Sequence, residues 1–188
     1  MRVLVAGLVL FLGMHLVPTV APLRAGLAAR LGARGYRGVF ALLSGVGLAL
    51  VIVGYWRADR GAQLFAPSVG TVHAAPLVMT LAFILLATSH APSHLRATLR
   101  HPMLLAVLAW SLVHLFANGD ARGTLLFGAF AAWAVADLVS AVQRGTSPTF
   151  APRWRADIVS VVAGVALALL VMTFHRVLFG PQVVPWGV

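Results

Sequence analysis

Six long apolar runs, separated by short polar connections, dominate the hydrophobic pattern of this 188-residue chain. The runs occupy residues 3–21, 39–56, 72–89, 102–117, 123–141 and 158–179. Each approaches the ~20 residues that a helix needs to cross a bilayer, the fourth run being the shortest. Helices are expected because lipid offers no hydrogen-bond partner to exposed backbone groups. The pattern therefore predicts an all-α, polytopic membrane helix bundle of about six transmembrane helices, in a single domain over residues 1–188.

The connection after the first apolar run has a periodicity of its own. Pro22 suits the first turn of a helix, and Leu23, Leu27 and Leu31 recur every four residues among arginines. Alternating apolar and basic faces are typical of a helix that lies on a membrane surface. We therefore expect a short interfacial helix between the first two transmembrane helices.

Composition supports a membrane environment and narrows the chemistry. The chain is 61% hydrophobic and only 10% charged, with a mean hydropathy of +0.95. So few charges cannot cover the surface of a soluble domain of this length. There is no Cys, which excludes disulfides and thiolate metal sites and leaves His and Asp as metal ligands. No catalytic triad, P-loop or dinucleotide fingerprint supports a hydrolase, kinase or dehydrogenase.

The distribution of arginine predicts orientation and partners. The net charge of +10 comes from arginines that lie between the apolar runs, so we expect lipid headgroups rather than nucleic acid as partner. Nine arginines follow the first, third and fifth runs: Arg24, Arg30, Arg34, Arg37, Arg96, Arg100, Arg144, Arg153 and Arg155. The positive-inside rule then predicts a bacterial cytoplasmic membrane protein with both termini periplasmic.

Ionisable side chains within the apolar runs are the first candidates for function, because they are costly in lipid. His15, His114 and His175 lie in the first, fourth and sixth runs. Neutral imidazole binds haem iron, zinc or copper. Haem b held by two imidazoles is the most economical cofactor in a helix bundle without thiolates. His15 and His114 are expected to differ in membrane depth by roughly 10 Å, and His175 matches the depth of His114 better. The alternative is that each is a hydrogen-bonded core histidine.

Further candidates lie near the inner membrane surface. His101 and Asp137 are both near the inner ends of their runs, so a hydrogen bond between them is a hypothesis, since it would lower the cost of the carboxylate in lipid. Asp137 would then orient His101 or an arginine that binds a haem propionate, and the alternative is a purely structural pair or an end group that reaches the membrane surface. Arg100 is a candidate partner for haem propionates because a guanidinium fork matches a carboxylate, with lipid contact as the alternative. At the opposite surface, residues 118–120 are predicted to form a turn in which Asp120 caps the fifth transmembrane helix.

One long segment resembles a known family. Residues 100–120 read RHPMLLAVLAWSLVHLFANGD and closely resemble the signature of the NnrU family of bacterial integral membrane proteins. The resemblance extends to residues 11–15, 31–60, 125–141 and 175–180, which is nearly the whole chain. The family takes its name from bacterial loci for nitrite and nitric oxide reduction. The resemblance thus implies a membrane protein associated with denitrification.

The NnrU family is also similar to the plant 15-cis-zeta-carotene isomerases, membrane proteins that are thought to hold haem b through two histidines. This similarity carries the first haem ligand onto His15 and the second onto His114. The plant motif has a Cys three residues before its second His, where this chain has Ser111. Any exchange of a thiolate for an imidazole ligand is therefore unavailable here.

Two kinds of function follow from the sequence. The first is a haem-b membrane protein that performs redox or isomerase chemistry on an apolar small molecule or a diatomic ligand. The second is a non-catalytic accessory or assembly factor for denitrification reductases, without bound haem. The sequence leaves open whether His15 or His175 is the partner of His114.

Overall fold

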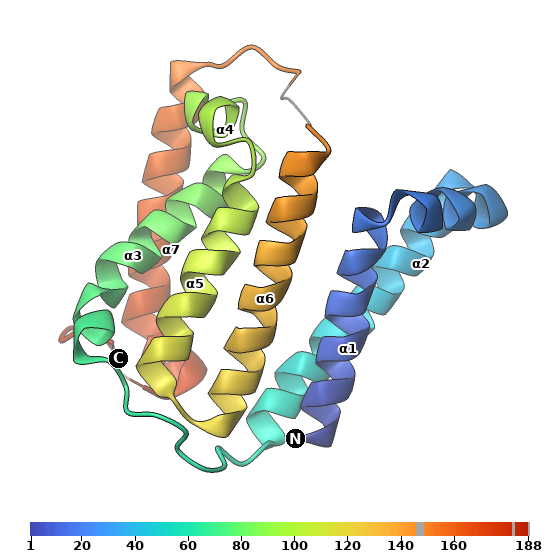
Figure 1. The fold of residues 1–188 in the computed structure, drawn as a ribbon. Helices are drawn as coiled ribbons and strands as arrows, with labels where there is room; N and C mark the ends of the chain where they lie inside the picture. The colour runs from blue at the N-terminus through green and yellow to red at the C-terminus, as the bar shows by residue number, and fades with distance from the viewer. Residues whose placement is uncertain (146–148, 182, 188) are drawn as a thin grey trace. The chain divides into compact units, whose positions relative to one another are not determined.

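The chain is helical throughout its named elements (Figure 1). A computed structural model describes residues 1–145, 149–181 and 183–187. Its elements are α1 (Arg2–Leu16), η1 (Val17–Thr19), α2 (Ala21–Arg57), α3 (Val69–Thr88), α4 (His94–Leu99), α5 (Pro102–Asn118), α6 (Ala121–Gln143) and α7 (Trp154–Phe179). Within the described residues, five helices are long and apolar enough to cross a membrane, and α5 is a shorter apolar helix. The prediction of a polytopic helical membrane protein is confirmed.

The helices form two compact units. Unit 1 comprises Met1–Ala66 and Asn118–Ser140, and unit 2 comprises Pro67–Ala117 and Ala141–Val188. Unit 1 thus contains α1, η1, α2 and nearly all of α6. Unit 2 contains α3, α4, α5 and α7.

Helix α2 is two helical segments joined at a glycine. Gly32 has φ 70° and ψ 161°, which is not helical, so the chain turns between residues 21–31 and residues 33–57. A positive φ of this kind is readily adopted only by glycine. The first segment corresponds to the predicted interfacial helix, and its Leu23 and Leu31 side chains are exposed. Exposed leucines beside arginines suit insertion between lipid headgroups.

Unit 1 is held together where glycines let two helix backbones touch. α1 packs along α2 (Figure 1). A Cβ on Gly7 would lie 2.5 Å from the backbone nitrogen of Val51, and one on Gly47 would lie 2.7 Å from that of Phe11. A Cβ on Gly54 would overlap the backbone of Leu4. Small residues at helix contacts are expected in membranes, where association depends on close packing rather than on the hydrophobic effect.

In unit 2, α3 and α7 also pack through a glycine, but at fewer positions than α1 and α2. A Cβ on Gly164 would overlap the backbone of Ile84. Further along α7, the buried side chains of Ala168 and Met172 form a small core to which Met79 and Phe83 of α3 add partly buried surface. One close backbone approach and one side-chain cluster therefore join this helix pair.

The turn before α6 confirms a prediction from the sequence. Gly119 has φ 72°, and the Asp120 carboxylate accepts a 2.6 Å hydrogen bond from the backbone N–H of Gly123. Arg122 donates to the carbonyl oxygens of Tyr55 and Ala58 at 3.0 and 2.9 Å. Because these carbonyls end α2, the arginine satisfies acceptors that the helix itself leaves open.

Candidate functional site

Two predicted site histidines, His114 of α5 and His175 of α7, come together in unit 2. Their ring centroids are 6.5 Å apart and their planes differ by 28°. The Nδ1 atom of His114 lies 2.8 Å from the carbonyl oxygen of Trp110, one helical turn earlier. The Nδ1 atom of His175 lies 2.7 Å from the carbonyl oxygen of Pro181, which follows the turn at Gly180.

These hydrogen bonds determine the tautomers of both rings. A carbonyl oxygen can only accept, so the proton of each neutral imidazole is on Nδ1 and the lone pair is on Nε2. A backbone carbonyl that accepts from Nδ1 is the usual way in which proteins orient a histidine that binds a metal through Nε2. The Nε2 atom of each ring therefore has the lone pair that metal binding requires.

Aromatic side chains extend this histidine pair at both ends. The Trp110 ring lies 5.5 Å from the His114 ring, and the Phe179 ring lies 5.0 Å from the His175 ring. Ser111, which occupies the position of the plant cysteine, is fully buried and donates its hydroxyl to the carbonyl oxygen of Leu108 at 3.0 Å. Ser111 thus bonds to its own helix backbone.

His15 lies in unit 1, in a different environment. Its Nδ1 lies 2.7 Å from the carbonyl oxygen of Phe11, which gives it the same tautomer as the other two histidines. Its ring centroid is 4.3 Å from that of Phe11, 5.2 Å from that of Phe40 and 5.7 Å from that of Trp133. Side chains from α1, α2 and α6 therefore surround this imidazole with aromatic rings.

The other predicted contacts of the candidate site residues stay predictions. His101 belongs to unit 2 and Asp137 to unit 1, so their hydrogen bond stays a prediction. His15 belongs to unit 1 and His114 to unit 2, so the binding of one iron by both also stays a prediction. Arg100 is exposed and has a positive φ of 61° where α4 ends. Its pairing with a propionate is likewise untested.

Comparison with protein families places nearly the whole chain in one of them. Residues 3–183 match the family described as NnrU protein. The chain belongs to the NnrU family. Curated proteins and solved structures gave no match. Since the family match covers residues 3–183, His15, His114 and His175 all lie within the NnrU region.

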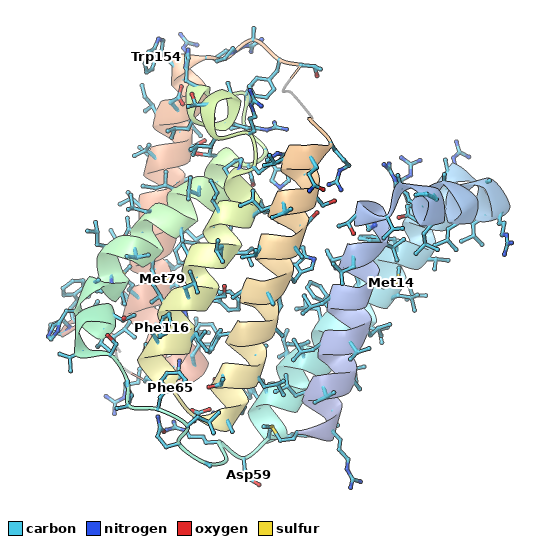
Figure 2. The ribbon with its side chains drawn as sticks, viewed as in Figure 1. Met14, Asp59, Phe65, Met79, Phe116 and Trp154 are labelled. Carbon is cyan, nitrogen blue, oxygen red and sulfur yellow. The ribbon has the colours of Figure 1, made fainter. Side chains whose placement is uncertain are left out.

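One histidine outside the predicted site residues, His94, forms a polar contact with a carboxylate in this NnrU chain. In unit 2, the Nδ1 atom of His94 lies 2.7 Å from the Asp157 carboxylate, which also accepts from the backbone N–H groups of His94 and Leu95 at 3.2 and 3.1 Å. The Trp154 ring lies 4.4 Å from the His94 ring, where α7 begins beside α4 (Figure 2). The carboxylate thereby fixes the N-terminus of α4 to the first turn of α7.

That pairing was not foreseeable from spacing. His94 and Asp157 are 63 positions apart in the sequence, so no local pattern brings them together. Among the described residues, no group of three or more His, Cys, Asp or Glu side chains gathers as a metal site would require.

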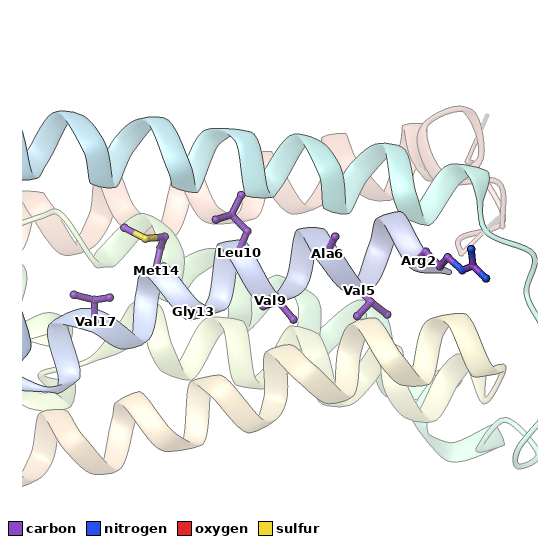
Figure 3. A pocket seen from close by; sticks show the side chains of 8 residues that line it. All are labelled: Arg2, Val5, Ala6, Val9, Leu10, Gly13, Met14 and Val17. Atoms are coloured by element: carbon purple, nitrogen blue, oxygen red, sulfur yellow. The ribbon is translucent and has the colours of Figure 1, made fainter.

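An apolar groove of about 760 Å³ runs along one face of α1 (Figure 3). It is lined by Arg2, Val5, Ala6, Val9, Leu10, Gly13, Met14 and Val17. His15 is not among them, and Arg2 at one end is the only charged side chain of the lining. Such a surface suits lipid acyl chains and lacks the polar groups that orient a reacting substrate.

Proposed function

We propose that this NnrU-family membrane protein binds haem b through His114, with His175 as the second imidazole ligand. The observation that carries the proposal is the pair of rings 6.5 Å apart, each with its Nδ1 bonded to a backbone carbonyl. His114 and His175 would hold the haem, and each would offer its Nε2 lone pair to the iron. Two neutral imidazoles are a donor set that haem iron commonly takes, which supports the proposal.

In this proposal the protein supplies ligation, orientation and an apolar surround. Nδ1 bonds to Trp110 and Pro181 raise the basicity of the two ligands and hold their planes. Bound haem would supply electron transfer or the binding of a small ligand, as the iron and its axial ligands determine. Family membership supports a link with denitrification, so the substrate classes are a diatomic nitrogen oxide or an apolar molecule in a redox or isomerase reaction.

The membrane orientation is part of the same proposal. Nine of the fourteen arginines follow the first, third and fifth apolar runs, which correspond to α1, α3 and α6. This bias favours a bacterial inner-membrane protein with periplasmic termini. Cysteine accessibility at positions 2 and 144 in intact cells and spheroplasts tests it. Labelling of Arg2→Cys but not of Arg144→Cys from the periplasmic side is expected, and the reverse would refute the orientation.

The test of haem binding is a reduced-minus-oxidised visible spectrum of the purified protein, with four alanine variants. We expect a low-spin b-type signal that is lost in His114→Ala and His175→Ala. His73→Ala is the matched control, because the His73 Nδ1 also bonds a carbonyl one turn away, at Val69, while the ring is exposed. This variant should keep the signal.

The other outcomes are equally informative. Loss of the signal in His15→Ala, with retention in His175→Ala, would assign the second ligand as the family resemblance implies. A colourless wild-type protein, after haem is supplied during expression, would overturn haem binding. An accessory role in the assembly of denitrification reductases would then be the better account.

A further inference from the structure

The two histidines of the proposed haem site are oriented by backbone carbonyls of different kinds. The Nδ1 of His114 bonds the carbonyl oxygen of Trp110, which belongs to the same helix. The Nδ1 of His175 bonds the carbonyl oxygen of Pro181, an exposed residue beyond the end of α7. A helix holds its own carbonyls in place, whereas a carbonyl beyond the helix is only as fixed as the segment that carries it. The orientation of His175 therefore depends on what holds Pro181.

The chain leaves α7 through a turn that its local sequence favours. Gly180 ends the helix with a φ of 98°, and its N–H donates to the carbonyl oxygen of Arg176 at 3.0 Å. Glycine adopts a positive φ readily, and the ring of the following Pro181 fixes the φ of that residue near roughly −65°. The described residues after α7, 180–181 and 183–187, are called the return segment because they next contact an earlier part of α7.

Val184 attaches the return segment to unit 2. Its side chain is only 4% exposed and forms a small core with Ala168 and Met172 of α7. The backbone approaches the same helix again at Gly187, where a Cβ would lie 3.3 Å from the carbonyl oxygen of Met172. A buried apolar side chain thus holds the segment whose carbonyl at Pro181 orients the second histidine.

We propose that Val184 is a positioning residue of the haem site. By holding the return segment against α7, it keeps the Pro181 carbonyl on the Nδ1 of His175, and so keeps the Nε2 lone pair in one direction. The role in haem binding rests on the proposed function. Without the Val184 contact, the His175 ring would exchange its proton between both nitrogens, while His114 would keep the carbonyl of its own helix.

The first measurement needs no haem. Nitrogen NMR of the full chain with isotope-labelled histidine, at about pH 8 where imidazole is neutral, reports which ring nitrogen carries the proton. The His175 signals are identified by their loss in His175→Ala. We expect the Nδ1–H tautomer in the wild type and averaged tautomers in Val184→Ala. Val183→Ala is the matched control, because Val183 is 40% exposed, and it should equal the wild type. The His114 signals should stay unchanged in both valine variants.

The second measurement uses the haem-loaded protein. Titration of the reduced protein with carbon monoxide reports how readily an axial imidazole is displaced. Loss of a group that orients a metal ligand weakens metal binding roughly 10- to 100-fold, so Val184→Ala should bind carbon monoxide roughly tenfold more tightly than the wild type. Val183→Ala should not differ from the wild type.

A second variant guards against a defect of volume or folding. Val184→Thr has a similar shape but places a hydroxyl in the apolar core, so it should resemble Val184→Ala in both measurements. Far-UV circular dichroism should stay unchanged, because Val184 lies outside the helices.

The outcomes separate the role of Val184 from haem binding itself. A colourless wild-type protein in which Val184→Ala still averages the His175 tautomers would refute haem binding and support the positioning of His175 by Val184. An unchanged His175 tautomer in Val184→Ala would overturn the positioning role, whether or not haem binds. A changed tautomer with unchanged affinity for carbon monoxide would overturn the part that concerns haem.

Discussion

The two units hold their helices together by different means. In unit 1, Gly7, Gly47 and Gly54 bring the α1 and α2 backbones into contact along most of the length of α1. In unit 2, α3 and α7 meet at one such glycine, Gly164, and the Asp157 carboxylate adds a polar connection to α4.

The two units solve the problem of helix association in lipid in two different ways. Helices in lipid gain little from burying apolar surface, because lipid tails are as apolar as leucine. Repeated close backbone packing is one solution, and hydrogen bonds to a buried charge are another. Close backbone packing should be sensitive to added side-chain volume. Hydrogen bonds to a buried carboxylate should be sensitive to the loss of its charge. Four pairs of substitutions test this difference.

Gly54→Ala should give the largest loss of stability, because its Cβ would overlap the backbone of Leu4, which cannot rotate away. We expect the free energy of unfolding to fall by about 2 kcal/mol. Gly45→Ala is the control on the same helix, since a Cβ there meets nothing within 4 Å. That variant should be unchanged or slightly more stable, as alanine favours helix. Denaturation in mixed micelles measures both, and equal behaviour would refute glycine packing in unit 1.

Gly164→Ala should separate α7 from Ile84 of α3 and lower stability by roughly 1–2 kcal/mol. The loss is expected to be smaller than for Gly54→Ala, because the α3–α7 pair has side-chain contacts further along that can adjust. Gly70→Ala, where the nearest atom is 4.0 Å away, is the control within unit 2. A loss greater than that of Gly54→Ala would reverse the order of the two units.

Asp157→Asn should weaken the polar connection of unit 2, because the amide replaces one of the two accepting oxygens by an N–H₂ group that only donates, so the bond to His94 or the bond to Leu95 is lost. A smaller loss of stability than for Gly164→Ala is expected, with faster hydrogen exchange at the backbone amides of His94 and Leu95. Asp59→Asn changes the same charge at an exposed position and should leave exchange at these amides unaltered. Unchanged exchange in both variants would show that the carboxylate does not hold α4.

Asp120→Ala should have the smallest effect of the four, about 1 kcal/mol, through loss of the cap on α6 in unit 1. Ser68→Ala removes the corresponding cap on α3 in unit 2. The Ser68 hydroxyl accepts from the N–H of Thr71 at 3.3 Å, whereas the Asp120 carboxylate accepts from that of Gly123 at 2.6 Å. A still smaller loss of stability is therefore expected for Ser68→Ala. Thermal unfolding of the two variants measures the difference, and a larger effect at Ser68 would contradict it.

The candidate site was predictable in part. Histidines within apolar runs stand out because charge is costly in lipid, and His15, His114 and His175 were found on this ground. Their membrane depths favoured His114 with His175, which the structure brings together in unit 2. The ring cluster around His15 was not predicted, since Phe40 and Trp133 resemble any other aromatic residue of a transmembrane helix.

The sequence by itself determined the all-helical membrane fold, the approximate bounds of the helices, the break before the second transmembrane helix, the turn at Asp120 and membership in the NnrU family. These features depend on hydropathy, local backbone preference and motif, which are properties of neighbouring residues. Only the tertiary structure decided that Gly54 touches Leu4, that Asp157 binds His94 and that Trp133 faces His15. Such contacts depend on the rotation and tilt of each helix, which packing sets and which a hydropathy pattern does not encode.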